Sequence, residues 1–160
     1  STHDYSDQEF WDEYYSSPAS GDAYEWFEQG YDVVRGVILN GIPKGTRPEE
    51  ARVLHLGCGN SRLGAELYDD GVPNVMNLDY SSEVIAALAE RHEWDRPEMG
   101  WVAMDAADLD SEEASGMAAD SYDVLVDKAM LDAISCLPGG GEETMKRVAK
   151  GGARVLRPGG

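Results

Sequence analysis

A strand, a glycine turn and a helix at residues 53–70 constrain the fold of this chain most. The apolar run at 53–56 is typical of a buried parallel strand. Gly57 and Gly59 follow at once, and glycine accepts backbone angles and close approaches that a Cβ atom would block. The apolar spacing at 62–70 then predicts a helix. Such a unit directs free backbone N–H groups and the positive end of a helix dipole toward a ligand.

The spacing of the glycines narrows the choice of ligand. A dinucleotide fingerprint needs a third glycine at the place that Arg62 occupies, and Gly64 lies too far along the chain. A P-loop is excluded because no Gly-Lys-Ser/Thr follows. The remaining common ligand of such a turn is S-adenosylmethionine, which has no pyrophosphate. A tight turn without any ligand stays an alternative, since short motifs also occur by chance.

Length and composition predict one domain with its own hydrophobic core. The chain has 160 residues, of which 42% are hydrophobic. It has no apolar run of membrane-spanning length and no signal pattern at its start. Cys58 and Cys136 are the only cysteines, so we expect free thiols in a reducing compartment and a cytoplasmic protein. The three histidines are scattered, and we predict no metal site.

The net charge of −18 limits the partners. It argues against binding of nucleic acid or of an anionic membrane through a broad basic face. It permits a basic protein partner, which long-range attraction would steer. The alternative is that the charge serves solubility alone.

The remaining pattern predicts an α/β fold with a parallel sheet and helices on both faces. Residues 1–42 form an aromatic helical cap, in which Ser6 caps a helix at 7–15 and a second short helix carries Tyr24, Trp26 and Phe27. A further helix covers 31–39, and the cofactor-binding core covers 51–160. Right-handed crossovers give the strand order 3-2-1-4. The expected strands are 53–56, 74–78, 100–104 and 122–126. The expected helices of the core are 62–70, 129–135 and 142–156, together with a helix that Ser81 caps and in which Val84, Ile85 and Leu88 share a face.

Three of these strands end in an acidic residue: Asp79, Asp105 and Asp127. One aspartate after a strand is usually a turn or cap residue. Because the carboxyl ends of parallel strands face one crevice, three of them beside a glycine turn are better explained by a shared site. We expect Asp79 to accept hydrogen bonds from ribose hydroxyls and Tyr80 to lie against an adenine.

Motifs along nearly the whole chain carry a family resemblance. They are Phe10-Trp11-Asp12-Glu13-Tyr14-Tyr15, Glu25-Trp26-Phe27, Leu56-Gly57-Cys58-Gly59-Asn60-Ser61, Pro73-Asn74-Val75, Asp79-Tyr80-Ser81-Ser82, Met104-Asp105, Asp127-Lys128, Leu131-Asp132-Ala133 and Val155-Leu156-Arg157-Pro158-Gly159-Gly160. With them the chain resembles the class I S-adenosylmethionine-dependent methyltransferases, and within these the eukaryotic enzymes that methylate lysine in translation elongation factor 1-alpha.

The resemblance implies a Rossmann-like fold and a single methyltransferase domain over 1–160. It implies transfer of methyl groups from S-adenosyl-L-methionine to a protein lysine, with S-adenosyl-L-homocysteine as the product. The implied cofactor contacts are Trp11, Tyr15, Trp26, Gly57, Gly59, Asp79, Tyr80, Asp105, Ala106, Asp127 and Lys128. A small-molecule methyltransferase and a non-catalytic cofactor-binding or partner-binding module are the alternatives, and an NAD-dependent oxidoreductase is disfavoured by the glycine spacing.

The chain departs from this family in two ways. Ala129-Met130 stands where similar proteins have Gly-Thr, on the acceptor side of the expected site. Similar proteins also continue after the Pro-Gly-Gly turn into a fifth strand and an antiparallel pair, so we expect the later strands to be missing from residues 1–160. No residue identifies itself as a general base, and Asp127 is a weak candidate.

Overall fold

The computed structural model describes residues 5, 7–17 and 30–160. The predicted cap residue Ser6 and the predicted helix with Trp26 lie outside the described residues. In the described part of the chain, no helix combines the length and the apolar character that crossing a membrane requires.

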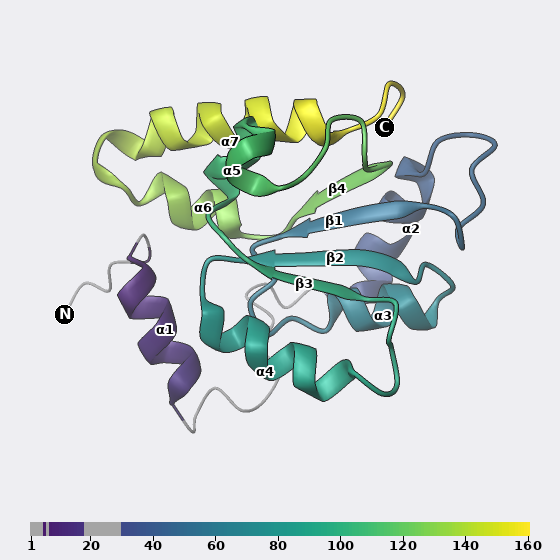
Figure 1. Ribbon diagram of the computed structural model, residues 1–160, viewed down its shortest axis with the longest axis horizontal. Coiled ribbons are helices and arrows are strands. Elements are labelled where there is room, and N and C mark those ends of the chain that lie inside the picture. Colours follow the sequence, from purple (N-terminus) through teal and green to yellow (C-terminus); the bar gives the residue numbers. More distant parts are fainter. Residues whose placement is uncertain (1–4, 6, 18–29) are drawn as a thin grey trace.

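Four parallel strands form the centre of the molecule (Figure 1). They are β1 (Arg52–Leu56), β2 (Asn74–Asp79), β3 (Gly100–Ala103) and β4 (Val124–Asp127). Their order is β3-β2-β1-β4, which confirms the predicted topology. In the register, Val53 of β1 lies opposite Val75 of β2 and Val124 of β4. All four strands therefore end on the same edge of the sheet.

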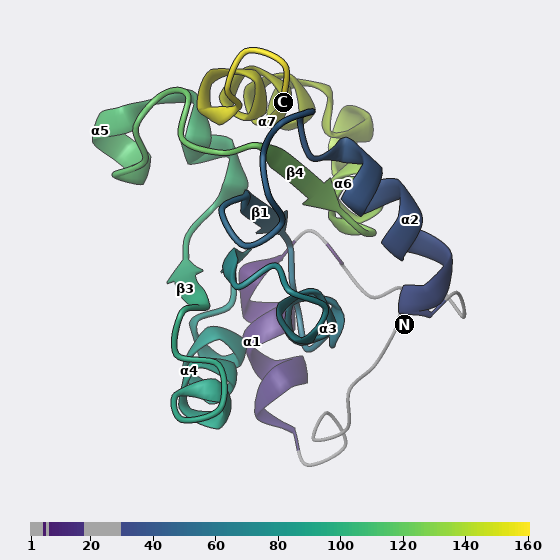
Figure 2. The ribbon, with the colours of Figure 1, turned by 90° about the vertical axis from the view of Figure 1, so that its right-hand side faces the viewer.

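Both faces of the sheet are buried, which explains the continuous apolar runs in its strands. Along β1, Val53 belongs to the core on one face, whereas Leu54 and Leu56 belong to the core on the other. Each of these three side chains is at most 1% exposed. Figure 2 looks along the strands and shows helices on both sides of the sheet.

The first helical layer contains α2 (Tyr31–Gly41), α3 (Leu63–Asp69) and α4 (Ser82–His92). Ile38 of α2 packs with Leu63 and Leu67 of α3 against Val53. Helix α2 is therefore part of this layer. The second layer, on the opposite face, consists of η2 (Ala106–Asp110), α5 (Glu112–Ser115), α6 (Met130–Ser135), η3 (Pro138–Gly141) and α7 (Glu142–Val155).

Helix α7 approaches η2 closely at Gly151. A Cβ atom at Gly151 would lie 2.5 Å from the carbonyl carbon of Leu109 and 2.6 Å from the backbone nitrogen of Asp110. Since these are backbone atoms, no rotamer change can relieve the contact. Glycine at this position therefore permits the packing of the second layer.

We expect Gly151→Ala to lower the free energy of unfolding by about 1–3 kcal/mol, because α7 must move away from η2. Gly36→Ala in α2 is the matched control, since a Cβ atom there meets nothing within 4 Å. The control should gain up to about 1 kcal/mol from helix propensity. Urea denaturation measures both changes, and equal effects of the two substitutions would contradict the packing.

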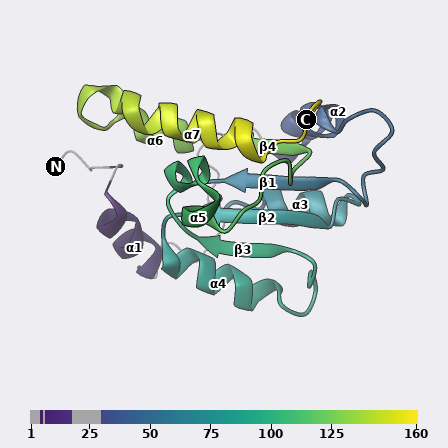
Figure 3. The ribbon, with the colours of Figure 1, turned by 45° about the horizontal axis from the view of Figure 1, so that its top comes forward.

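Helix α1 (Gln8–Ser16) lies across the edge where the strands end, beside α4 (Figure 3). The carboxylate of Asp7 caps it by accepting a hydrogen bond from Glu9 N at 3.0 Å. The side chain of Gln8 donates to the carbonyl of Tyr80 at 3.0 Å, and the hydroxyl of Ser81 donates to Asp12 at 2.5 Å. Ser81 was predicted to cap α4, but its side chain makes no cap hydrogen bond and holds α1 instead.

Candidate functional site

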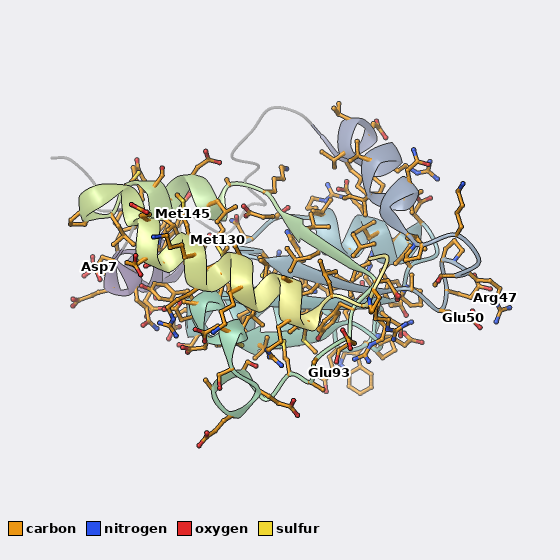
Figure 4. All side chains as sticks on the ribbon, turned by 90° about the horizontal axis from the view of Figure 1, so that it is seen from above. Asp7, Arg47, Glu50, Glu93, Met130 and Met145 are labelled. Carbon is orange, nitrogen blue, oxygen red and sulfur yellow. The ribbon has the colours of Figure 1, made fainter. Side chains whose placement is uncertain are left out.

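A cavity of about 530 Å³ lies over the carboxyl ends of the strands, between α1 and α6. This volume is in the range of about 300–1,000 Å³ that is usual for small-molecule sites. Figure 4 shows Met130 of α6 and Asp7 of α1 at this end of the molecule, and Arg47 and Glu50 at the other. The lining residues are Tyr5, Trp11, Tyr15, His55, Gly57, Cys58, Gly59, Asn60, Ser61, Leu78, Asp79, Tyr80, Met104, Asp105, Ala106, Lys128, Ala129, Met130, Asp132, Ala133, Ile134, Cys136, Leu137 and Thr144.

The glycine turn forms the floor of this cavity. Gly57 and Gly59 have φ angles of 58° and 48°, in the left-handed region that favours glycine. A Cβ atom at Gly57 would lie 2.5 Å from the Cβ of Met130, and one at Gly59 would lie 2.5 Å from the hydroxyl of Tyr15. The turn therefore needs glycine for its backbone angles and for the close approach of α1 and α6.

Asp79 joins the end of β2 to the glycine turn. Its carboxylate accepts hydrogen bonds from Gly59 N at 2.8 Å and from Ser81 N at 2.9 Å. The side chain is 8% exposed, and burial raises the pKa of its carboxyl, whereas the backbone hydrogen bonds lower it. Each carboxylate oxygen can accept more than one hydrogen bond, so Asp79 keeps acceptor capacity toward the cavity.

The other predicted residues at the strand ends lie around Asp79. Asp105 accepts a hydrogen bond from Ala107 N at 2.9 Å and caps η2, while Ala106 is buried beside it. Tyr80 follows Asp79, and Lys128 follows β4 on the far side of β1. All four residues line the cavity.

Aromatic side chains of the N-terminal region form one wall of the cavity. The rings of Trp11 and Tyr15 are stacked with centroids 5.8 Å apart, and the indole nitrogen of Trp11 donates to the carbonyl of Tyr5 at 2.8 Å. Burial and the nearby Asp79 raise the pKa of the Tyr15 hydroxyl, which therefore stays protonated at neutral pH. The wall thus presents aromatic faces and a neutral phenol.

Asp127 is the one described residue of the predicted set that is not among the lining residues. Its two carboxylate oxygens accept hydrogen bonds from Met130 N at 2.9 Å and Leu131 N at 3.2 Å, and so cap α6. Burial raises the pKa of its carboxyl. Asp79 and Asp105 thus lie in one cavity as expected, whereas Asp127 supports the helix beside it.

Ala129 has a φ angle of 85°, which is in the left-handed region and unfavourable for a residue with a Cβ atom. It stands at the position where the sequence resemblance has glycine, immediately before α6. We expect Ala129→Gly to raise the free energy of unfolding by about 0.5–1 kcal/mol, because the strain exceeds the extra chain entropy of glycine.

The matched control is Ala86→Gly on the exposed face of α4, which should lower the free energy of unfolding by about 1 kcal/mol. Thermal denaturation of both variants gives the two signs. Destabilisation by Ala129→Gly would contradict the strained conformation.

Sequence reasoning missed much of the cavity wall that α6 and its flanks provide. The lining residues on this side are Met130, Asp132, Ile134, Cys136 and Leu137. In the sequence, the departure from the family's Gly-Thr at Ala129-Met130 was the signal that indicated this side of the cavity. His55 was also missed; it is 1% exposed on β1, and its ring nitrogen Nδ1 lies 3.2 Å from Asn77 Oδ1.

Comparison with known proteins identifies the class that this fold and cavity define. The family model described as "Methyltransferase domain" matches residues 53–160, and the chain belongs to this family. It is 34% identical over 166 residues to EEF1A lysine methyltransferase 4 from Mus musculus, covering 98% of this chain and 59% of that protein. It is 32% identical over 163 residues to the eEF1A lysine and N-terminal methyltransferase from Homo sapiens, covering 100% of this chain and 21% of that protein.

A solved structure confirms the fold independently of close sequence similarity. The YcgJ protein from Bacillus subtilis superposes with a TM-score of 0.55 at 17% identity, over 80% of this chain and 47% of that one. The chain spans 59% of the length of EEF1A lysine methyltransferase 4 and a smaller part of the human relative. The predicted resemblance to the class I methyltransferases is thus confirmed, and the predicted sheet matches the structure.

Proposed function

We propose that this chain is the cofactor-binding part of an S-adenosylmethionine-dependent methyltransferase that methylates a lysine side chain of a protein. The observation that carries the proposal is the cavity in which the glycine turn, Asp79, Asp105 and Trp11 come together at the carboxyl ends of the strands. The methyl donor is S-adenosyl-L-methionine, and the product is S-adenosyl-L-homocysteine. The relatives named for lysine methylation of eEF1A support the class of acceptor.

The residues of the cavity fit the parts of this donor. Asp79 and Asp105 offer acceptors to the ribose hydroxyls and the adenine amino group, with Tyr80 and Ala106 against the base. The turn at Gly57 and Gly59 leaves room for the methionine part.

Two charged parts of the donor need partners of their own. Its carboxylate needs a cation, and Lys128 is the described cavity residue with an ammonium group. Its sulfonium is attracted to aromatic faces, which Trp11 and Tyr15 provide in this cavity. Trp26 lies outside the described residues and stays a predicted cofactor contact, and we include Asp127 in the proposed site through its support of α6.

The donor supplies a methyl group on a positively charged sulfur. A neutral amine attacks the methyl carbon, the new N–C bond forms as the C–S bond breaks, and the electron pair passes to sulfur. Lysine has a pKa of about 10.4 in water, so the site must favour loss of its proton. The chain's contribution is to hold the two reactants in line and to exclude water, which can supply most of the rate enhancement.

The electrostatic character of the cavity mouth favours a basic acceptor protein. Helix α1, which forms one wall, carries Glu9, Asp12 and Glu13 and no Lys or Arg. Helix α7 begins beside the cavity with Glu142 and Glu143, whose two charges are partly offset by Lys146 of the same helix. Together with the net charge of −18, these groups attract a positively charged segment around the target lysine.

We also propose that the protein is cytoplasmic, since Cys58 and Cys136 are free thiols.

A transfer assay with methyl-labelled S-adenosylmethionine tests the proposed function. Purified eEF1A and a protein-free metabolite extract serve as parallel acceptors. We expect label on a lysine of eEF1A, and loss of that label with the Asp79→Ala variant. Label in the metabolites alone would favour a small-molecule methyltransferase. Absence of label despite cofactor binding would favour a non-catalytic module.

Attraction between the acidic mouth and a basic acceptor predicts a salt effect on one reactant only. Between about 0.05 and 0.2 M ionic strength, the KM for the protein acceptor should rise severalfold because exposed charges are screened. The Kd for the cofactor should change less, since its contacts lie inside the cavity. Steady-state kinetics at several salt concentrations measure the first quantity, and calorimetry measures the second. A KM independent of salt would contradict the electrostatic attraction.

A further inference from the structure

The sheet order divides the cavity into two sides. Asp79 and Asp105 follow β2 and β3 on one side of β1, whereas α6 follows β4 on the other. With ribose and adenine on the first side and methionine over the glycine turn, the methyl group faces the α6 side. The acceptor amine therefore approaches from the side of α6, which Figure 1 shows beside the end of β4.

The wall on this side suits an unbranched aliphatic side chain. Met130, Ile134 and Leu137 line it and are each half-buried, so they offer apolar surface without closing the entrance. Asp132 belongs to the same wall but is exposed, which places its carboxylate at the rim. A negative charge at the rim attracts an incoming ammonium, and the apolar passage behind it suits the four methylene groups that follow.

The carboxylates that line the cavity differ in how they are engaged. Asp79 accepts two backbone N–H groups, and Asp105 accepts one. For Asp132 the hydrogen bonds go to its backbone carbonyl, from the Ser135 hydroxyl at 2.5 Å and the Cys136 thiol at 3.6 Å. In the part of the chain that the structure describes, the Asp132 carboxylate is left available to a ligand.

We propose that Asp132 binds the ammonium group of the acceptor lysine as it enters the cavity, and that Met130, Ile134 and Leu137 hold its methylene stem once the amine has moved on toward the methyl group. This inference rests on the proposed function and names the acceptor half of the same cavity. Pairing with Asp132 draws the amine to the entrance, and the apolar passage then directs it toward the methyl group. The amine still has to lose its proton before transfer.

The test compares two short peptides that have no other charged side chain and differ in one residue, lysine or norleucine, so that only the ammonium changes. Their affinities for the chain are measured by calorimetry in the presence of S-adenosyl-L-homocysteine. We expect the lysine peptide to bind about fivefold more tightly than the norleucine peptide, as for a half-exposed charge pair. Asp132→Asn should remove this preference, and Asp132→Glu should restore part of it.

Glu90→Gln is the matched control. Glu90 is an exposed carboxylate near the C-terminal end of α4, and it does not line the cavity. It should keep the full preference for lysine, and all variants should bind S-adenosyl-L-homocysteine as the unaltered chain does. A lysine preference that survives Asp132→Asn would overturn the role of Asp132. Cofactor binding without any preference for lysine would also overturn it and leave the proposed function standing. Failure to bind the cofactor would overturn the proposed function and this inference together.

Discussion

Replacing Asp79 by alanine is expected to lower the affinity for S-adenosylmethionine by about 10-fold to 150-fold. This range corresponds to the loss of about 1.5–3 kcal/mol for hydrogen bonds to a charged group. The same change should lower the free energy of unfolding by at least about 2 kcal/mol, since the N–H groups of Gly59 and Ser81 would lose their buried acceptor. The turn then loses its attachment to β2 at the place where we propose that the ribose binds.

A second buried aspartate separates the loss of affinity from the loss of stability. Asp123 is 2% exposed, accepts a hydrogen bond from Arg52 N at 2.8 Å and pairs with Arg157 at 3.0 Å. It precedes β4, at the edge of the sheet opposite the cavity. Asp123→Ala should destabilise the fold similarly and leave cofactor affinity unchanged.

Calorimetry and urea denaturation on both alanine variants make this comparison. Asp79→Asn, which keeps one acceptor oxygen, replaces Asp79→Ala if the alanine variant does not fold. Unchanged cofactor affinity in a folded Asp79 variant would contradict the assignment.

The second large effect concerns the aromatic wall. We expect Trp11→Ala to weaken binding of S-adenosylmethionine by about 30-fold, because a desolvated contact between an aromatic ring and a cation contributes about 2 kcal/mol. The demethylated product has no charge on sulfur, so its affinity should fall by a smaller factor. A contact with adenine would instead weaken both ligands equally, and titration with each ligand distinguishes the two cases.

Phe10 provides the control for Trp11. It packs edge-on against Trp11 with centroids 5.1 Å apart, but it is not among the residues that line the cavity. Phe10→Ala should therefore disturb the aromatic cluster and leave the affinity ratio of the two ligands unchanged. Circular dichroism checks the fold of each variant. If Trp11→Ala binds both ligands as tightly as the unaltered chain, the aromatic residues form only a structural cap.

The sheet could be predicted because local sequence and tertiary burial agree there. The strands are mainly apolar on both faces, apart from the buried His55 in β1 and Asn77 in β2, and the connecting helices have their own period. The start of β4 was less accurate, at Val124 and not at Tyr122. The backbone N–H of Tyr122 donates to the carbonyl of Val155, the last residue of α7, and its carbonyl accepts from the N–H of Arg157. These partners lie more than 30 positions away, so the local pattern could not reveal them.

The site was predictable only where a motif fixes the backbone. The glycine turn and Asp79 lie as expected because both depend on strand ends of a parallel sheet. Asp127 has the same sequence context, yet its carboxylate turns to the N–H groups of α6. Ser81 bonds to Asp12, which is 69 positions away, and the side of α6 that faces the cavity depends on packing. These outcomes follow from long-range contacts that no local pattern contains.

Parallel calorimetric titrations of the chain with S-adenosyl-L-homocysteine and with NAD test the central claim most directly. The cavity over the glycine turn predicts one molecule of S-adenosyl-L-homocysteine bound per chain, with Asp79→Ala much weaker and Asp123→Ala unchanged, and no binding of NAD. Binding of NAD in its place, or equal binding of S-adenosyl-L-homocysteine by the unaltered chain and the Asp79→Ala variant, would contradict the account.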